Sequence, residues 1–176
     1  QESAPRGMAF NNDGTKMYVI GLGGDDVNEY SLSTAFDVST SSYVQNFSVS
    51  AQDTYPQGMT FNNDGTKMYV LGDQGNDVNE YTLSTAFDVS SASFAGNNER
   101  FSVQSQDTHP LGMAFNNDGT KMYIIGGYGK DVNEYSLSTA FDVSTASYVQ
   151  LFSVQSQETY PQVNTSSNFP EKLSFT

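Results

Sequence analysis

Aspartate and glutamate are the side chains that this sequence offers most plentifully for chemistry, since it holds 20 of them against 7 lysines and arginines. They recur in register at three stretches of the chain, so a symmetric fold would arrange each set as part of a ring. A ring of oxygen ligands near one face could bind Ca²⁺ or Mg²⁺, which prefer hard oxygen donors. The best candidate ligands are Asp26, Asp77 and Asp131. The other sets are Asp13, Asp64 and Asp118; Glu29, Glu80 and Glu134; and Asp37, Asp88 and Asp142.

A structural role is the alternative for most of these carboxylates. Asp13 lies in Asn-Asp-Gly, a turn sequence, and Asp37 precedes Val-Ser, where an aspartate commonly accepts a hydrogen bond from its own loop backbone. The chain has no EF-hand spacing, so any calcium site would be irregular. Ca²⁺ is therefore the one cofactor that the sequence suggests, beside an interpretation with no cofactor at all.

Residues for nucleophilic or acid–base catalysis are scarce. His109 is the only histidine, and its place in the other repeats is taken by Tyr55 and Tyr160, so it is expected to replace an aromatic side chain rather than act as a base. The chain has no cysteine, which excludes disulfides and thiolate ligands or nucleophiles. A hydrolase triad or a zinc site is hard to assemble from this set.

Three glycine-rich turns are the most variable part of the repeats: 21–24, 72–75 and 126–129. They are not phosphate loops, because no helix follows them and no lysine occupies the Walker position. Variable loops on a rigid scaffold usually carry binding specificity. Tyr128 could stack on a sugar ring, although an exposed loop tyrosine is also an ordinary loop residue. The candidate ligand-binding residues are Asp25, Asp73, Gln74, Asn76, Tyr128 and Lys130.

The net charge of −13 makes nucleic acid and anionic membrane surfaces poor partners, because a negative field repels phosphates. No apolar run has the length of a membrane span, and Gln1 is not followed by a signal-peptide pattern. An acidic, cysteine-free surface rich in Asn, Ser, Thr and Gly is typical of secreted bacterial or viral proteins. We therefore expect an extracellular or secreted location and no membrane insertion.

An internal repeat fixes the architecture that must position these residues. The stretch from Pro5 to Tyr18 recurs from Pro56 and again from Pro110, and residues 5–55 match residues 110–160 at 41 of 51 positions. The repeats are 1–51, 52–105 and 106–156, and a partial fourth unit occupies 157–176. The second repeat carries three extra residues within 95–100, which predict either an edge bulge or a partner site.

Each repeat predicts four short strands and no helix of more than about one turn. In the first repeat these strands are 7–10, 16–20, 26–32 and 43–49, and Asn12-Asp-Gly14 forms the first hairpin turn. A period of about 40–50 residues with four antiparallel strands is the signature of β-propeller blades. The predicted fold is all-β, with three four-stranded blades and part of a fourth.

One motif adds a family resemblance. The pattern Phe-Asn-Asn-Asp-Gly-Thr-Lys-Met-Tyr-Val, present with small changes in all three repeats, resembles the Phe-Ser-Pro-Asp-Gly-Lys-x-Leu-Tyr-Val hairpin of YVTN-type and lactonase-like propellers. The resemblance implies radially arranged blades whose first strands line a central channel. It carries no chemistry by itself.

Three blades are too few to close a propeller, which needs about four to eight. An open arc leaves a sheet face uncovered at each end, and such faces favour self-association. We therefore expect a second copy as partner, in a completed ring or a head-to-tail assembly. Residues 163–176 would supply a closing strand or form a divergent tail.

Because blades stack on both faces, we expect one set of apolar side chains to be buried in every repeat. In the first repeat these are Met8, Phe10, Met17, Val19, Tyr30, Leu32, Phe36 and Phe47, and Phe61 is the most informative member in the second. The predicted function is a non-catalytic extracellular module for self-assembly or adhesion. The alternatives are a glycan-binding lectin and, suggested by the resemblance alone, a lactonase-like or cation-dependent hydrolase.

Overall fold

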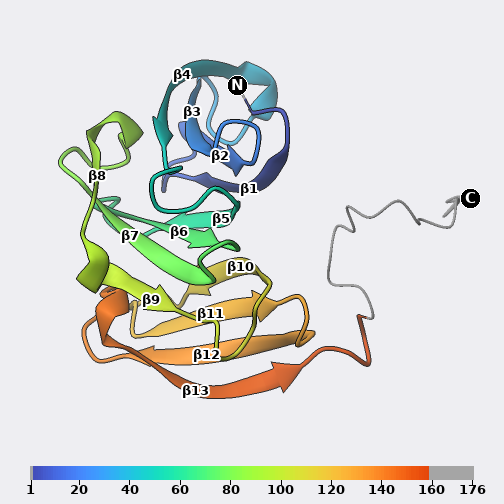
Figure 1. Cartoon of the computed structure of the whole chain (residues 1–176). Coiled ribbons are helices and arrows are strands. Elements are labelled where there is room, and N and C mark those ends of the chain that lie inside the picture. Colours follow the sequence, from blue (N-terminus) through green and yellow to red (C-terminus); the bar gives the residue numbers. More distant parts are fainter. Residues whose placement is uncertain (1, 159–176) are drawn as a thin grey trace, which may run out of the picture.

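The computed structural model describes residues 2–158, and each repeat forms one antiparallel sheet, called a blade below (Figure 1). Blade 1 contains β1 (Pro5–Phe10), β2 (Lys16–Gly21), β3 (Asp26–Leu32) and β4 (Ser41–Ser48). Blade 2 contains β5 (Pro56–Phe61), β6 (Lys67–Gly72), β7 (Asp77–Leu83), β8 (Ala92–Phe94) and β9 (Arg100–Ser102). Blade 3 contains β10 (Pro110–Phe115), β11 (Lys121–Gly126), β12 (Asp131–Leu137) and β13 (Ala146–Ser153).

The helical content of residues 2–158 is four single 3-10 turns: η1 (Val38–Thr40), η2 (Val89–Ser91), η3 (Asn97–Glu99) and η4 (Val143–Thr145). None of these is long or apolar enough to cross a bilayer. The all-β prediction is confirmed, and the third strand of each repeat has the predicted bounds. Predictions for residues 159–176, including the closing strand, lie outside the described residues.

The Asn-Asp-Gly turn begins each blade in the same way. Gly14 has a φ angle of 71°, which residues with a Cβ atom rarely adopt, and its amide donates to the Asn11 carbonyl at 3.2 Å. The Asp13 carboxylate accepts from the Thr15 amide at 2.9 Å and from its hydroxyl at 2.6 Å. These bonds lower the pKa of Asp13, so this carboxylate fixes the turn, as the structural interpretation expects.

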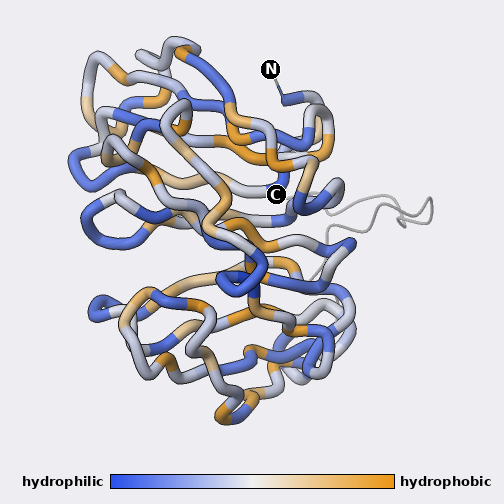
Figure 2. The backbone as a smooth tube through the Cα atoms, turned by 60° about the vertical axis from the view of Figure 1, so that its left-hand side comes forward, coloured by the Kyte–Doolittle hydropathy of each residue, from blue (hydrophilic) through white to orange (hydrophobic). Residues whose placement is uncertain are grey.

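The blades stack face to face around neighbouring inner strands, with β5 lying between β1 and β10 (Figure 1). Alternate residues of each strand point to opposite faces, so blade 2 contributes to two cores. The first core joins Tyr18, Ile20 and Val27 of blade 1 to Met59, Met68, Val70 and Tyr81 of blade 2. The second joins Tyr69, Leu71 and Val78 of blade 2 to Met122, Ile124 and Tyr135 of blade 3. Figure 2 shows hydrophobic stretches along the strands, separated by hydrophilic turns.

The burial prediction is wrong for two residues of blade 1, because their face has no described neighbour. Met8 is 55% exposed and Phe36 is 58% exposed, whereas Leu32 is buried as predicted. The remaining members of the set are half-buried: Phe10, Met17, Val19, Tyr30 and Phe47.

In blade 2, the equivalent of Met8 is Met59, which blade 1 covers and which is buried. Phe61 is half-buried, and its ring centroid lies 4.6 Å from that of Tyr18 and 5.4 Å from that of Phe87. The predicted strand faces are therefore correct. The missing neighbour accounts for the exposed residues in blade 1.

The extra residues of the second repeat interrupt its outer strand. β8 and β9 both pair with β7, and η3 lies between them. Arg100, at the start of β9, places its Nε 3.1 Å from the Asp77 carboxylate and 2.9 Å from the Asn79 amide oxygen. The insertion thus interrupts the edge of the sheet, and the partner-site interpretation stays a prediction.

Candidate functional site

Adjacent blades are locked together by a recurring set of three side chains, called the socket. In blade 1, the Lys16 ammonium lies 2.7 Å from the Glu29 carboxylate. Lys16 and the Tyr18 hydroxyl both donate to the Phe87 carbonyl of blade 2, at 2.8 and 2.7 Å. The other Glu29 oxygen accepts from the Val89 amide at 3.1 Å. The socket thus binds the backbone of one loop in the next blade.

The second socket repeats this chemistry between blades 2 and 3. It consists of Lys67, Tyr69 and Glu80, with 2.7 Å between the Lys67 ammonium and the Glu80 carboxylate. Lys67 and Tyr69 donate to the Phe141 carbonyl at 2.9 and 2.6 Å, and the Val143 amide donates to Glu80 at 3.4 Å. Blades 1 and 2 therefore hold their neighbours by the same contacts.

The loop that enters each socket, called the docking loop, spans 36–38, 87–89 or 141–143. Its phenylalanine has a positive φ angle in all three blades: 59° at Phe36 and 58° at Phe87 and Phe141. Such a bulky residue rarely adopts this conformation. Packing explains it: the phenylalanine amide donates to the carbonyl of the turn glycine in its own blade, and the ring lies against that glycine. The docking loop is therefore shaped within its own blade.

One docking loop and one socket remain without a partner among residues 2–158. In blade 1, Val38 is 56% exposed, whereas its equivalents Val89 and Val143 are fully buried. In blade 3, Lys121 and Glu134 lie 2.7 Å apart, and Gln150 donates to Glu134 at 2.9 Å, but no described loop contacts them.

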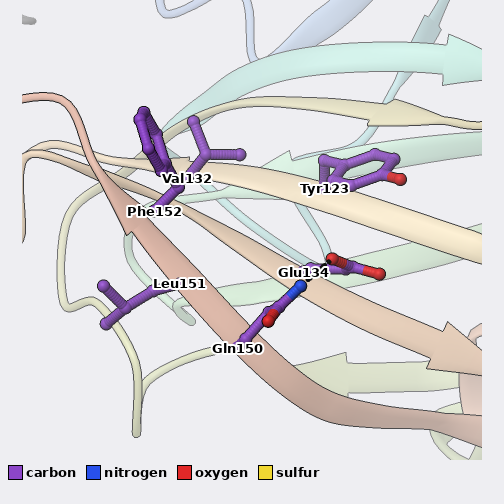
Figure 3. Close-up of a pocket in the computed structure, with 6 residues that line it drawn as sticks. All are labelled: Tyr123, Val132, Glu134, Gln150, Leu151 and Phe152. Carbon is purple, nitrogen blue, oxygen red and sulfur yellow. Dashed lines mark hydrogen bonds between the residues drawn. The ribbon is translucent and has the colours of Figure 1, made fainter.

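A pocket marks this open socket (Figure 3). It is lined by Tyr123, Val132, Glu134, Gln150, Leu151 and Phe152. Figure 3 shows Gln150 reaching toward Glu134, with the apolar Val132 and Phe152 farther along the same face. The pocket can accept a backbone carbonyl, a backbone amide and an apolar side chain.

The predicted ligand-binding residues lie in the glycine-rich turns or directly after them, and three of them have an unusual backbone conformation. Asp25, Asn76 and Lys130 occupy equivalent positions directly before the third strand, with φ angles of 48°, 49° and 51°. Asparagine and aspartate tolerate this left-handed conformation better than most residues. These side chains come from separate blades, and their shared property is the turn.

Asp73, Tyr128 and the single histidine meet between blades 2 and 3. His109 Nδ1 lies 2.8 Å from an Asp73 carboxylate oxygen, and the His109 ring lies 5.1 Å from that of Tyr128, tilted by 31°. Tyr128 is 70% exposed. Gln57, which is buried, donates to the second Asp73 oxygen at 3.5 Å. The arrangement offers an exposed aromatic face beside a carboxylate and an amide.

The remaining candidate ligand, Gln74, accepts a bond from Thr54 at 2.6 Å, and the Asn76 amide group, oriented to satisfy its neighbours, donates to the Asp73 and Thr108 carbonyls. The His109–Asp73 pair could not be predicted from the sequence, because only the stacking of blades brings the residue before β10 and the β6–β7 turn together.

Solved structures with a similar backbone identify the fold of these stacked blades. A putative 6-phosphogluconolactonase from Bacteroides fragilis superposes with a TM-score of 0.62 at 13% identity, over 85% of this chain and 39% of that one. A periplasmic gluconolactonase from Pseudomonas aeruginosa gives 0.60 at 19%, over 86% and 40%. The β-propeller domain of Cps50 (Swd1) from Myceliophteria thermophila gives 0.53 at 10%, over 85% and 43%. This chain has a β-propeller fold.

The propeller covers only about two fifths of the length of these structures, and the low identities show the fold alone. No family model matches the chain, and no curated protein is significantly similar to it in sequence. The predicted lactonase-like propeller fold is supported, and the activities named for the similar structures belong to those proteins.

The three predicted metal ligands of the propeller are buried within separate blades. Asp26, Asp77 and Asp131 each accept from the asparagine two residues later, at 2.6, 2.6 and 2.7 Å. Burial raises the pKa of Asp77 and Asp131. Within residues 2–158 no three histidine, aspartate or glutamate side chains lie close enough to hold a metal ion. The calcium site stays a prediction.

Two further carboxylates, Asp53 and Asp107, were not identified as structural residues from the sequence. Asp53 accepts from the Gly75 amide at 2.8 Å, and Asp107 accepts from the Gly129 amide at 2.6 Å, so each fastens a glycine-rich turn to the start of its blade. A Cβ atom on Gly72 would clash with the Asp53 carboxylate. The register of Gln52-Asp53 with Gln106-Asp107 was the available signal, but only the fold shows what these carboxylates bind.

Proposed function

We propose that this protein is a non-catalytic propeller module that works by self-assembly through its two terminal blade faces. One observation carries the proposal: within residues 2–158 the contacts that join neighbouring blades are satisfied twice, and one further docking loop and one further socket are left exposed. Closed propellers have about four to eight blades. The outer faces of blades 1 and 3 are therefore the faces on which further blades would pack.

The apolar character of the two open faces supports association. On blade 3, Ile125 pairs with Val132 and Val132 with Phe152, so these three side chains share the open face. Phe152 is 70% exposed. On blade 1, Met8 occupies the opposite open face. At about 25 cal/mol per Å² of apolar surface, covering a few hundred Å² contributes several kcal/mol.

Native mass spectrometry of the full chain tests the proposal. We expect masses of two or more copies of the 19.2 kDa chain at micromolar concentration. Because each copy carries a net charge of −13, raising the ionic strength should strengthen association by screening like charges. A folded monomer at both low and high ionic strength would rule out self-assembly. The extracellular location and an adhesive role remain predictions beside it.

A second candidate function rests on the exposed Tyr128 ring beside His109 and Asp73. Aromatic faces flanked by carboxylates and amides suit the apolar faces and hydroxyl groups of sugars. Titrating the protein with a panel of neutral hexoses, followed by NMR, should shift the Tyr128 and His109 ring signals. Tyr128→Ala should abolish the shift of the His109 signal. Tyr55→Ala is the control and should preserve it, because Tyr55 is an exposed tyrosine at the His109 position of the preceding repeat. Unchanged ring signals with all hexoses would exclude this function.

The hydrolase alternative has no comparable support. His109–Asp73 is the one histidine–carboxylate pair among the described residues, and within residues 2–158 no hydrogen bond joins it to a serine or threonine hydroxyl. Association through blade faces therefore remains the function that the structure supports best.

A further inference from the structure

We infer that a second copy of this chain inserts its Phe36–Val38 docking loop into the open socket formed by Lys121, Tyr123 and Glu134. The inference rests on the proposed self-assembly and names its partner, polarity and contacts. The two interfaces inside the chain supply the template, because each consists of a docking loop in a socket of the same residue types.

The donors and acceptors of the open socket match those of the filled ones. By analogy with Lys16 and Tyr18, the Lys121 ammonium and the Tyr123 hydroxyl would donate to the partner copy's Phe36 carbonyl. Glu134 would accept from the Val38 amide, as Glu29 accepts from Val89. Each group is a strong hydrogen-bonding partner that the remainder of the described chain leaves at the surface.

A fourth contact favours the pairing of blade 3 with blade 1. Between blades 1 and 2, Gln45 donates both to Glu29 at 3.0 Å and to the docking-loop residue Asp88 at 2.8 Å. Gln150 already donates to Glu134 and is the equivalent of Gln45, so it is placed to donate also to Asp37 of the arriving loop. The new interface would therefore reproduce the contact between blades 1 and 2 in full.

The free docking loop has its bound conformation before it docks. The φ angle of Phe36, 59°, is within 1° of the 58° of the two docked phenylalanines, and its amide donates to the Gly14 carbonyl at 2.9 Å. Asp37 caps η1 by accepting from the Ser39 amide at 3.0 Å. A loop that is already ordered loses little conformational entropy on binding.

Hydrogen bonds between the Asn-Asp-Gly turns of successive blades give independent evidence for how two copies would align. Asn12 donates to the Asn63 carbonyl at 2.7 Å, and Asn63 donates to the Asn117 carbonyl at 2.6 Å. Asn117 is exposed at the end of this series. In the inferred assembly Asn117 donates to the carbonyl of a blade 1 turn residue, Asn12, in the next copy.

The assembly is head to tail, because the docking loop and the socket lie on different faces. Each copy contributes one of each, so two copies can close a ring of six blades, which is within the range of closed propellers. If the rotation between copies does not close, the same contact continues into a filament.

Two variants test the polarity of this contact. Val38→Asp places a charge where the docked equivalents are fully buried, and Tyr123→Ala with Glu134→Ala removes socket groups. All three residues are exposed or half-buried in the single chain, so folding should persist, as far-UV circular dichroism would verify. Either variant should weaken self-association by at least about 100-fold. Val44→Asp, on an exposed outer-strand residue away from the loop, is the matched control and should assemble normally.

Mixing the two variants gives the decisive result. The loop variant keeps an intact socket and the socket variant keeps an intact loop, so the mixture should form a 1:1 heterodimer that neither variant forms alone. If only the socket variant is monomeric, blade 3 faces pair with each other, and the inference is wrong while self-assembly stands. If only the loop variant is monomeric, blade 1 faces pair, with the same consequence. If both variants still assemble, or if the mixture forms no heterodimer, the inferred contact between docking loop and socket is also wrong. If the wild-type chain is monomeric, the proposed self-assembly is wrong as well.

Discussion

Glu80→Ala is expected to lower the free energy of unfolding by about 3 kcal/mol, whereas Glu134→Ala, the same change in the next repeat, should have a clearly smaller effect. The Glu80 side chain is 2% exposed, lies 2.7 Å from the Lys67 ammonium and accepts from the Val143 amide. Its removal takes the carboxylate from the half-buried Lys67 ammonium, which keeps only the Phe141 carbonyl, and leaves the buried Val143 amide without its acceptor. Glu134 makes the same ion pair with Lys121, but no docking loop among residues 2–158 contacts it.

Urea denaturation of both variants under conditions that keep the chain dissociated would measure this difference. Two equal losses would mean that the filled socket contributes no more than an exposed ion pair. At high protein concentration, assembly should bring the cost of Glu134→Ala closer to that of Glu80→Ala, because docking would bury Glu134.

The two glutamates should also respond to pH in opposite directions. Burial raises the pKa of Glu80 above its ordinary value of 4.5, so its ionisation opposes folding and its contribution becomes less favourable as the pH rises through that range. Bonds from Lys121 and Gln150 lower the pKa of Glu134. Its contribution is therefore present above the unfolded-state pKa and is lost as the pH falls.

Met68→Ala should destabilise the protein by about 2–5 kcal/mol, and Met17→Ala should have a clearly smaller effect in the monomer. Met68 is fully buried in the core between blades 1 and 2, whereas Met17, its equivalent, is half-buried on the open face of blade 1. The local sequences around the two methionines are nearly identical, so propensity cannot cause the difference. Thermal unfolding at matched dilute concentration is the appropriate measurement, and a larger loss at Met17 would contradict the assignment of the open face.

The strands and turns were predictable because their determinants are local. The Asn-Asp-Gly turn fixes its own hairpin through Gly14 and Asp13, and the same signals recur in each repeat. Burial was not predictable to the same degree. Met8 and Met59 have the same place in the repeat, yet Met8 is exposed and Met59 is buried, since only the second has a neighbouring blade.

The candidate site was predictable in part for the same reason. The variable turns were recognised from sequence, but the socket depends on a carbonyl more than 60 residues away, as in the bond from Tyr18 to Phe87, which has a sequence separation of 69. The structure also shows that Asp25, Asn76 and Lys130 have positive φ angles, which could not be read from the sequence, while their role in ligand binding stays a prediction.

The three inner hairpins share one register, which makes their strands interchangeable. Pro5 pairs with Gly21, and the equivalent prolines of the other blades pair with Gly72 and Gly126. During folding, a strand of one repeat can therefore pair with a partner from another and bury the same side chains. Closely similar neighbouring repeats are prone to this kind of misassembly.

The split outer strand of blade 2 limits such exchange. β4 and β13 are continuous eight-residue strands, whereas the outer strand of blade 2 is divided into β8 and β9 around η3. Arg100 of β9 reaches Asp77 and Asn79 in its own blade. The three inserted residues thus give the middle repeat an outer edge unlike those of its near-identical neighbours, so β8 and β9 are not interchangeable with β4 or β13.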